Sequence, residues 1–442
     1  MKVAITSRTQ GFEYSIELEA HDAPGGVRKP ENPAASGATL VGNRWQVQLP
    51  DSFHGLHPDL HAAAILYVLL PFVGRRLELP FSVSRGFADA IEARWRISLV
   101  RVDDAIAMRA APSNPRPCLL YSGGADSVAI SMLVPPDAVL LFLDRIARTD
   151  IAPQDPEARI DLREQRRVCD HARALGRDVL EVRDDHEALV RPYPCWHSEM
   201  SALPALYLAD SLGLQVLDSG DVLCGACFGG YHDGTRQEWR FMSLDWAISL
   251  VTRWQAGDRL PDELPVQYAL PMAAGLRRMA SGLGLSQVAT SAIVSRSAMR
   301  GRAFSCYRKT DEPYCLRCDK CFMKLLLAHV VEGQEVSAEL FESFLRQPHL
   351  ASIFARPVFD WHHIWVYLFQ KMRCEHPFAK RMRDQAQRAP DLSLLDRWYP
   401  KAEPLIPEAY RSSCKQEIAR YVPTMSPEDV ALLERLQVPA MR

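Results

Sequence analysis

The sequence predicts an α/β protein centred on a Rossmann-like parallel sheet, with an α+β region before it and a mostly helical region after it. Strand-like and helix-like stretches alternate over residues 118–218, which is typical of βαβ units. At roughly 150 residues per domain, the 442 residues allow about three domains. We therefore divide the chain into residues 1–114, 115–330 and 331–442.

The N-terminal region is predicted to be an α+β extension that forms a separate unit. Apolar and polar residues alternate over residues 14–18 and 45–49, as in half-buried strands. Helical spacing follows over residues 60–70 and 87–95, and a proline-rich joint at residues 111–117 is interpreted as a linker.

The central region is predicted to hold four strands and two connecting helices. Each helix is followed by a glycine, Gly176 or Gly213, as is common just past a helix end. In a parallel sheet of this kind, the ligand binds at the carboxyl ends of the strands. From about Lys324 onward the pattern is mostly helical. The strands are expected at residues 118–121, 138–143, 178–183 and 214–218, and the helices at 162–175 and 198–212.

The segment after the first of these strands carries the strongest chemical signal. The strand runs into SGGADS at residues 122–127, and a helix follows. Consecutive glycines permit backbone conformations closed to other residues, so the backbone N–H groups can surround an anion. Ser122 and Ser127 add hydroxyl donors, and the helix N-terminus favours negative charge. Asp126 would repel a bare phosphate, which implies a bridging Mg²⁺ ion.

Other phosphate-binding and catalytic motifs do not occur in the sequence. It contains no G-x-x-x-x-G-K-[ST], G-x-G-x-x-G, G-x-S-x-G or H-E-x-x-H, and residues 122–127 include no lysine. The alternative interpretation of this segment is a serine-glycine turn at the end of a strand.

Four of the 11 cysteines lie close together in the sequence. Cys315, Cys318 and Cys321 form C-x-x-C-x-x-C, and Cys306 precedes them. Four thiolates suit a tetrahedral Zn²⁺ ion. An iron–sulfur cluster uses similar spacings, and unrelated cysteines in a loop are the remaining alternative.

The two motifs together resemble those of known enzymes. The SGG-x-D-S loop after the first strand of an α/β unit resembles the PP-loop of the N-type ATP pyrophosphatases, which include GMP, NAD and asparagine synthetases. Ser305-Cys306-Tyr307 followed by C-x-x-C-x-x-C resembles the QueC-like 7-cyano-7-deazaguanine synthase family. The resemblance covers about residues 116–327 and neither flank.

This resemblance implies a fold of the adenine nucleotide alpha hydrolase type, a zinc-binding segment and a set of ligands. ATP and Mg²⁺ would bind at Ser122, Gly123, Gly124, Asp126 and Ser127, with catalytic roles for Asp126 and Ser127. The carboxylate of 7-carboxy-7-deazaguanine would attack the α-phosphorus of ATP and release pyrophosphate. Ammonia would take the acyl group as an amide, and a second adenylation would dehydrate the amide to a nitrile.

The resemblance also implies residues for the substrate. Tyr231 would stack on the deazapurine, Asp233 would bind its guanine-like edge, and His232 lies between them. Glu199 would face the nucleotide from the helix before the fourth strand. The alternative for the segment that holds Tyr231 is an ordinary glycine-rich surface loop.

The sequence departs from the family at two places. The family's lysine after a later strand is replaced in the stretch GLRRMA, so Arg277, or the neighbouring Arg278, would contact the nucleotide in its place. The family's Tyr-Gly-Gln-Arg-His after the second strand is missing, and only the backbone at Leu143 would contact the adenine.

These departures and the two flanking regions favour a variant of the housekeeping reaction. QueC-like proteins with extra segments also occur in antiphage gene clusters, where the acyl group would pass to a protein amine. Two other hypotheses are a PP-loop enzyme that modifies tRNA by thiolation and a partner-binding module that keeps a nucleotide without catalysis. A homo-oligomer and a separate protein partner are both compatible with the sequence.

The composition bears on partners and location. With 52 basic and 54 acidic residues, the net charge of −2 lacks the electrostatic footprint of a nucleic-acid binder. The longest apolar run, residues 62–73, is far shorter than the ~20 residues that span a membrane. The N-terminus has no apolar segment typical of a signal peptide. We expect a cytoplasmic protein without a membrane or nucleic-acid partner.

Overall fold

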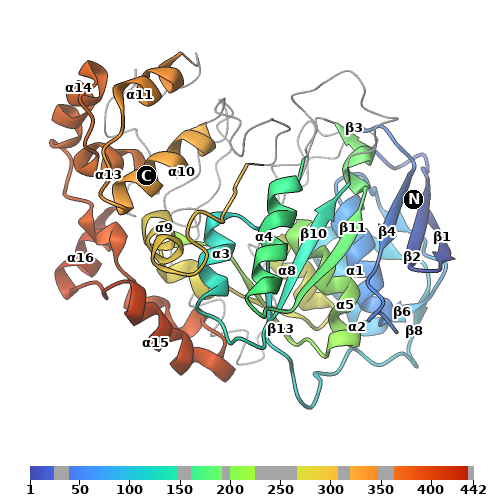
Figure 1. The fold of residues 1–442 in the computed structure, drawn as a ribbon. Coiled ribbons are helices and arrows are strands. Elements are labelled where there is room, and N and C mark those ends of the chain that lie inside the picture. The colour runs from blue at the N-terminus through green and yellow to red at the C-terminus, as the bar shows by residue number, and fades with distance from the viewer. Residues whose placement is uncertain are drawn as a thin grey trace.

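A computed structural model gives the arrangement of the chain and describes residues 1–23, 39–146, 161–191, 200–223, 266–306, 319–346 and 363–436. Within these residues, an eight-stranded mixed sheet forms the centre of the molecule (Figure 1). The order across this sheet is β1 (Lys2–Arg8), β2 (Gly11–Glu17), β4 (Arg44–Gln48), β11 (Val179–Asp184), β10 (Val139–Arg145), β9 (Cys118–Leu120), β13 (Val216–Ser219) and β14 (Arg277–Met279).

Five neighbouring strands of this sheet run parallel to one another: β11, β10, β9, β13 and β14. The strand β9 has β10 on one side and β13 on the other, so the order of the chain across the sheet reverses at β9. Loops that leave neighbouring strands at such a point diverge and open a crevice at the carboxyl ends. The α/β class predicted from the sequence is confirmed, and each of the four predicted central strands occurs within two residues of its expected bounds.

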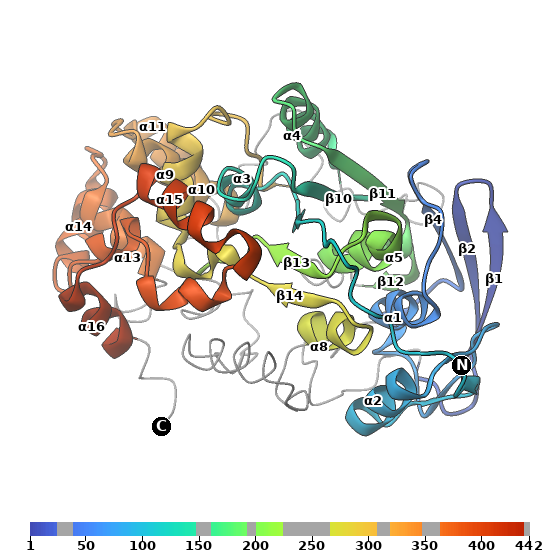
Figure 2. The same ribbon diagram turned by 90° about the horizontal axis from the view of Figure 1, so that it is seen from below.

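Helices cover both faces of the sheet, as the alternation of buried residues along the strands requires (Figure 2). Leu119 and Leu140 pack in one hydrophobic cluster, whereas their neighbours Leu120 and Val139 pack in another. The first face carries α3 (Ala125–Ser131), α4 (Arg163–Ala174) and α9 (Gln287–Arg296); the second carries α1 (Pro58–Leu69), α5 (Leu203–Leu212) and α8 (Val266–Ala273).

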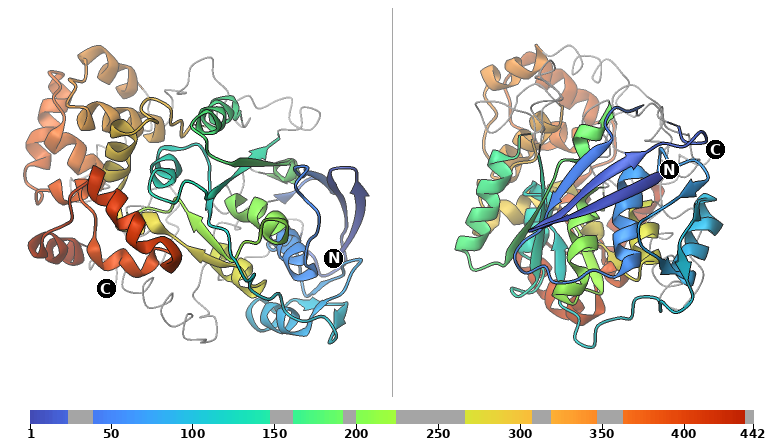
Figure 3. Two further views of the ribbon diagram at one scale, coloured as in Figure 1. Left: turned by 60° about the horizontal axis from the view of Figure 1, so that its bottom comes forward. Right: turned by 90° about the vertical axis from the view of Figure 1, so that its right-hand side faces the viewer.

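The N-terminal strands continue the central sheet (Figure 3). The pairing joins β4 to β11 in antiparallel register, with Arg183 opposite Gln48 and Asp184 opposite Val47. Helix α1 packs against α5, and both contribute to one hydrophobic cluster. The sequence predicted a separate unit here, whereas the structure has one shared sheet and core, because β4 covers the backbone edge that β11 would otherwise expose. The boundaries at residues 114 and 330 remain predictions.

A buried histidine lies where the N-terminal strands meet α1 and α5. The Nε2 atom of His61 is 2.8 Å from the hydroxyl of Tyr14, which donates to the hydroxyl of Tyr207 at 3.3 Å. Burial lowers the pKa of His61 to about 4, because the charged imidazolium loses its hydration there.

The protein is expected to lose stability between pH 6.5 and pH 4 through His61. The pKa is lower in the folded than in the unfolded state, so the unfolded state takes up the proton first as the pH falls. The free energy of unfolding should therefore drop by about 3 kcal/mol from this group. Urea unfolding at pH 7 and pH 4.5 would measure the drop, which His61→Gln should reduce. An unchanged pH dependence in the variant would contradict this assignment, and His363, whose pKa burial also lowers to about 4, should keep its own share.

The C-terminal helices form their own hydrophobic cluster beside the sheet (Figure 1). The helical pattern predicted from about Lys324 onward is confirmed for the described residues. No helix among those residues combines the length and apolar character that crossing a membrane would need. These helices are α10 (Asp319–Val331), α11 (Ala338–Leu345), α13 (His363–Lys371), α14 (Pro377–Ala386) and α16 (Pro427–Leu436), whereas α15 (Arg411–Tyr421) packs in the cluster that holds α3 and α9.

One buried contact ties the C-terminal region to the parallel sheet. The hydroxyl of Tyr410 donates to Oδ2 of Asp218 at 2.7 Å, and the backbone N–H of Ser281 donates to Oδ1 at 2.8 Å. Burial raises the pKa of Asp218, although these donors oppose that effect. Tyr410, which lies just before α15, thus supplies a hydrogen-bond donor to the buried carboxyl group of Asp218 in β13.

Replacing Tyr410 with phenylalanine is expected to lower the free energy of unfolding by about 1–3 kcal/mol, because the buried carboxyl group of Asp218 loses one of its donors. Tyr421→Phe is the matched control, since its hydroxyl has no hydrogen bond among the described residues. Urea unfolding of both variants checks the prediction, and equal losses in the two would refute it.

Candidate nucleotide-binding site

Residues 122–127 form a tight loop between β9 and α3, at the point where the strand order reverses. Gly123 has a φ of +71°, and a Cβ atom placed there would lie 3.2 Å from both Cα and Cβ of Gln165. Only glycine meets both conditions without strain. We call residues 122–127 the phosphate loop, after the ligand that the sequence predicts for them.

The phosphate loop presents several hydrogen-bond donors. Ser127 is buried, and its Oγ accepts from the backbone N–H of Ser122 at 3.1 Å and donates to the carbonyl of Gly124 at 3.1 Å. Ser122 is exposed. Within the described part of the chain, the backbone N–H groups of Gly123, Asp126 and Ser127 have no acceptor. The N–H groups of Gly124 and Ala125 between them already donate to Ser122 and Ser305, so Gly123, Asp126 and Ser127 are the donors left for an anion.

The positive charge at the loop comes from a residue that the sequence did not indicate. Nζ of Lys324, on α10, donates to both carboxylate oxygens of Asp126 at 3.0 Å. The side chain of Lys324 is 5% exposed and that of Asp126 is 24% exposed. Thr290, on α9, donates to the same carboxylate at 2.6 Å. The sequence predicted the charge at the N-terminus of α3, but that helix has only seven residues, so Lys324 is the stronger source.

The segment before the cysteine motif packs onto the phosphate loop. The backbone N–H of Phe304 donates to the carbonyl of Gly123 at 3.0 Å, and Oγ of Ser305 accepts from the N–H of Ala125 at 3.3 Å. Gln165, on α4, donates through Nε2 to the carbonyl of Phe304 at 2.8 Å and to that of Cys306.

The carboxyl end of β13 borders the loop on its other side. A Cβ atom at Gly220 would lie 3.0 Å from the N and Cα of Ser127, so the two backbones are in contact. The next residue, Asp221, accepts through Oδ2 from Tyr268 at 2.8 Å and from the buried guanidinium of Arg278 at 3.1 Å. Burial favours the protonated form of Asp221, but Arg278 and the hydrogen bonds outweigh it and hold its pKa below the usual value. This carboxylate is therefore ionised.

The other nucleotide contacts predicted from the sequence fall at different levels along the strands. The register of β10 with β9 places Leu143 level with Ser122, so its backbone is near the loop. The register of β14 and β13 places Arg277 opposite Val216, about 16 Å short of the loop along the strand direction. The structure thus does not bring Arg277 to the loop, and Lys324 supplies a cation there instead.

The remaining predicted site residues can be placed only in part. Cys306 and Cys321 are both buried, at 8% and 2% exposure. The described residues contain no group of three or more His, Cys, Asp or Glu side chains that could hold a metal, so the four-cysteine site remains a prediction. Six predicted site residues lie outside the described residues: Glu199, Tyr231, His232, Asp233, Cys315 and Cys318.

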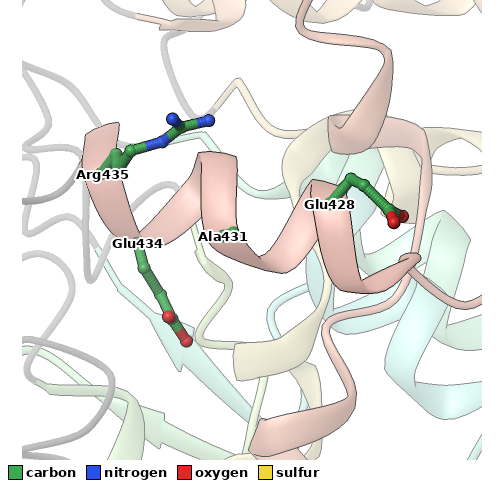
Figure 4. Close-up of a pocket in the computed structure, with 4 residues that line it drawn as sticks. All are labelled: Glu428, Ala431, Glu434 and Arg435. Carbon is green, nitrogen blue, oxygen red and sulfur yellow. The ribbon is translucent and has the colours of Figure 1, made fainter.

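A hollow lies in the C-terminal region, along one face of α16 (Figure 4). It is lined by Glu428, Ala431, Glu434 and Arg435, and none of the predicted site residues contributes to it. Glu434 is already engaged, since it accepts from the hydroxyl of Tyr399 at 3.0 Å. The phosphate loop is the better candidate for chemistry.

The fold and the loop define a class of protein: an α/β protein with a candidate anion site at the reversal point of its sheet. Residues 268–437 match the model of a family of unknown function, DUF6395. This span includes Thr290, Ser305 and Lys324, which contact the phosphate loop, but not the loop itself. A search of curated proteins found no match.

Proposed function

We propose that the protein is an ATP-dependent enzyme with a PP-loop fold of the adenine nucleotide alpha hydrolase type. The observation that carries this proposal is the phosphate loop at the reversal point of the sheet, with the buried Lys324 paired to the partly exposed Asp126 beside it. An unpartnered set of backbone N–H groups and a fixed cation suit the polyphosphate of a nucleotide.

Several groups at the loop contact the phosphates of the nucleotide. The backbone N–H groups of Gly123, Asp126 and Ser127 bind phosphate oxygens, and Ser122 adds an exposed hydroxyl. Lys324 exchanges its contact with Asp126 for a phosphate oxygen when the nucleotide enters.

Asp126 and Thr290 offer a carboxylate and a hydroxyl 2.6 Å apart, and such oxygen donors fit Mg²⁺. Bound there, Mg²⁺ would neutralise charge on the departing pyrophosphate. Asp126 would hold the ion, and Ser127 keeps the loop in shape through its hydrogen bonds with Ser122 and Gly124.

The proposed reaction is the adenylation of an organic acid followed by transfer to an amine. A carboxylate oxygen attacks the α-phosphorus of ATP, the bond to the β-phosphate oxygen breaks, and pyrophosphate leaves. The amine nitrogen then attacks the acyl carbon, AMP departs, and the amine proton passes to water. The loop and Lys324 hold the carboxylate and the α-phosphate in line and neutralise their negative charge.

The substrate proposal rests on the QueC-like motifs at residues 122–127 and 305–321. The acid is 7-carboxy-7-deazaguanine or a close relative, and the acceptor is ammonia or a protein amine, the latter in an antiphage setting. The cysteine motif binds Zn²⁺, and the enzyme works in the cytoplasm. The regions before residue 115 and after residue 330 select the acceptor.

Exchange of radiolabelled pyrophosphate into ATP tests the adenylation step. We expect exchange that requires both Mg²⁺ and 7-carboxy-7-deazaguanine and that Asp126→Asn abolishes. Asp104→Asn is the matched control, because Asp104 is an exposed carboxylate on the N-terminal region whose ion pair is with Arg85. No exchange in the wild type would refute the adenylation proposal.

Mass spectrometry of the products then identifies the acceptor. Incubation with ammonium should yield the amide or the nitrile, whereas a protein acceptor should gain the mass of the acyl group. If the wild type binds ATP but forms neither product, a module that holds a nucleotide without catalysis becomes the better explanation. A thiolated tRNA product would instead favour the tRNA-modifying alternative.

A further inference from the structure

The carboxylate of Asp221 lies next to the phosphate loop but takes no part in the contacts proposed for the nucleotide. A Cβ atom at Gly220 would lie 3.0 Å from the Cα of Ser127, and Asp221 is the next residue. Because consecutive Cα atoms are about 3.8 Å apart, the Cα atoms of Asp221 and Ser127 are at most about 8 Å apart. The carbonyl of Asp221 also packs against Gly282, where a Cβ atom would lie 2.5 Å from it. The backbone of Asp221 is therefore fixed beside the loop.

Only one of the two carboxylate oxygens of Asp221 is occupied. Its Oδ2 accepts from the hydroxyls of Ser219 and Tyr268, each at 2.8 Å, and from the guanidinium of Arg278 at 3.1 Å. Its Oδ1 accepts from no donor in the described part of the chain, and the side chain is 39% exposed. The carboxylate is thus held in one orientation and keeps an open acceptor atom.

The buried guanidinium of Arg278 keeps this carboxylate ionised. Arg278 is 4% exposed, it also donates to the carbonyl of Gln267 at 3.2 Å, and its guanidinium carbon lies 4.7 Å from the ring centre of Tyr268. Burial alone would raise the pKa of Asp221, but Arg278 and the hydrogen bonds hold this pKa below the usual value. Such a carboxylate stays negative and is a weak base near neutral pH. It therefore suits the binding of a positive charge better than the removal of a proton.

Asp221 and Asp126 bond to helices on opposite faces of the sheet. Asp126 bonds to Thr290 on α9, which packs on the same face as α3 and α4. Asp221 bonds to Tyr268 on α8, which covers the other face together with α1 (Figure 2). The metal proposed at Asp126 and Thr290 therefore does not involve Asp221.

The charge of Asp221 selects among the reactants of the proposed reaction. ATP and the carboxylic acid are both anions, which a carboxylate repels. The acceptor amine is neutral or cationic, and its nitrogen gains positive charge as it attacks the acyl carbon. A fixed carboxylate beside that nitrogen stabilises the charge that develops. The open Oδ1 atom matches the N–H groups of an amine, which are hydrogen-bond donors.

We propose that Asp221 binds the acceptor amine and stabilises the positive charge on its nitrogen during acyl transfer. This inference rests on the proposed function. The nitrogen donates an N–H to Oδ1, and its lone pair forms the bond to the acyl carbon. The bond from that carbon to the phosphate oxygen breaks, AMP leaves with the electron pair, and the extra proton of the nitrogen passes to water. Asp221 is a catalytic residue in this scheme, whereas Arg278, Tyr268 and Ser219 are positioning residues.

The N-terminal region borders this side of the site. Helix α1 packs against α8, and both contribute to the hydrophobic cluster of the face that Tyr268 occupies. The region before residue 115, which we propose to select the acceptor, therefore lies next to the helix that holds Asp221 in place.

Two half-reactions measured on the same preparations test the role of Asp221. Exchange of radiolabelled pyrophosphate into ATP reports the adenylation of 7-carboxy-7-deazaguanine, and mass spectrometry reports the amide formed with ammonium or with Nα-acetyllysine. In Asp221→Asn, we expect exchange within about threefold of the wild type and amide formation lower by roughly 100-fold. Asp178→Asn is the matched control and should change neither. Asp178 is 44% exposed and pairs with Arg116, but it lies just before β11, at the amino ends of the parallel strands.

A second variant separates the loss of the carboxylate from the loss of an ion pair. Asp221→Asn leaves the buried Arg278 without its counter-ion, which can destabilise the fold. The double variant Asp221→Asn/Arg278→Met removes both charges. It should keep pyrophosphate exchange and lose amide formation to the same extent as the single variant.

The outcomes distinguish this inference from the proposed function. Wild-type amide formation in Asp221→Asn would overturn the inference, and so would loss of exchange in both variants, since Asp221 would then serve the nucleotide or its metal. If Asp221→Asn needs more 7-carboxy-7-deazaguanine for half-maximal exchange, the carboxylate binds the acid and the inference is wrong. Exchange by the wild type without an amide from either acceptor would also overturn it. If the wild type shows no exchange, the proposed function itself fails, and the inference fails with it.

Discussion

Replacing Lys324 with methionine is expected to weaken the binding of ATP with Mg²⁺ by roughly 100-fold. A hydrogen bond from an ammonium to a phosphate oxygen contributes up to about 3 kcal/mol, which corresponds to that factor. Methionine has a similar length and keeps the packing of α10 against α9. Calorimetry with a non-hydrolysable ATP analogue measures the loss, and pyrophosphate exchange should fall with it.

The same replacement also removes the counter-ion of Asp126, and that effect must be separated from nucleotide binding. Asp126 keeps its bond to Thr290 and is partly exposed, so we expect a loss of only about 1–2 kcal/mol in unfolding free energy. The double variant Asp126→Asn/Lys324→Met removes both charges and should recover this stability without recovering affinity.

A surface lysine provides the matched control for this prediction. Lys371→Met removes a cation whose partner is Asp391, at 3.1 Å on the surface of the C-terminal helices. Its affinity for the nucleotide should stay within about twofold of the wild type. Wild-type affinity in Lys324→Met would show that this lysine serves only to neutralise Asp126.

Replacing Gly123 with alanine is expected to abolish measurable nucleotide binding and to destabilise the fold. The residue has a φ of +71°, which costs an alanine about 1–2 kcal/mol. The new methyl group would also lie 3.2 Å from the backbone of Gln165, so the loop or α4 must shift. Either shift displaces the N–H groups that are proposed to bind phosphate.

Gly176 separates the cost of a positive φ from the cost of close packing. It has a φ of +82°, and no atom lies within 4 Å of a Cβ placed there. Gly176→Ala should therefore show the conformational cost alone, with unchanged nucleotide affinity. Urea unfolding and calorimetry on both variants give the comparison. If the two variants behave alike in both measurements, close packing of Gly123 against Gln165 is irrelevant to the site.

The sequence predicted the phosphate loop because the signal is local. An apolar strand, two glycines and a helix follow one another within residues 118–133, and each is specified by its own residues. The same holds for the four central strands, whose apolar runs are marked off by turns. The strand β14 was missed because it has three residues, two of which are arginines.

The charged partner of the loop could not be predicted in this way. Lys324 is 198 residues from Asp126 in the chain, so no local pattern links the two residues. A weak signal was its position three residues after Cys321, on the helix that follows the cysteine motif. The sequence instead favoured Arg277, and strand register alone placed that residue too far back along β14.

By itself, the sequence determined the four central strands and the glycine-containing loop that follows the first of them, because periodicity and glycine act over a few residues. The tertiary structure decided what surrounds the anion site. It joined β4 to β11, reversed the strand order at β9, and set Lys324, Thr290 and Ser305 against the phosphate loop. These contacts join parts of the chain that are distant in the sequence. They form only when the strands and helices bury their apolar faces together and pair their buried charges.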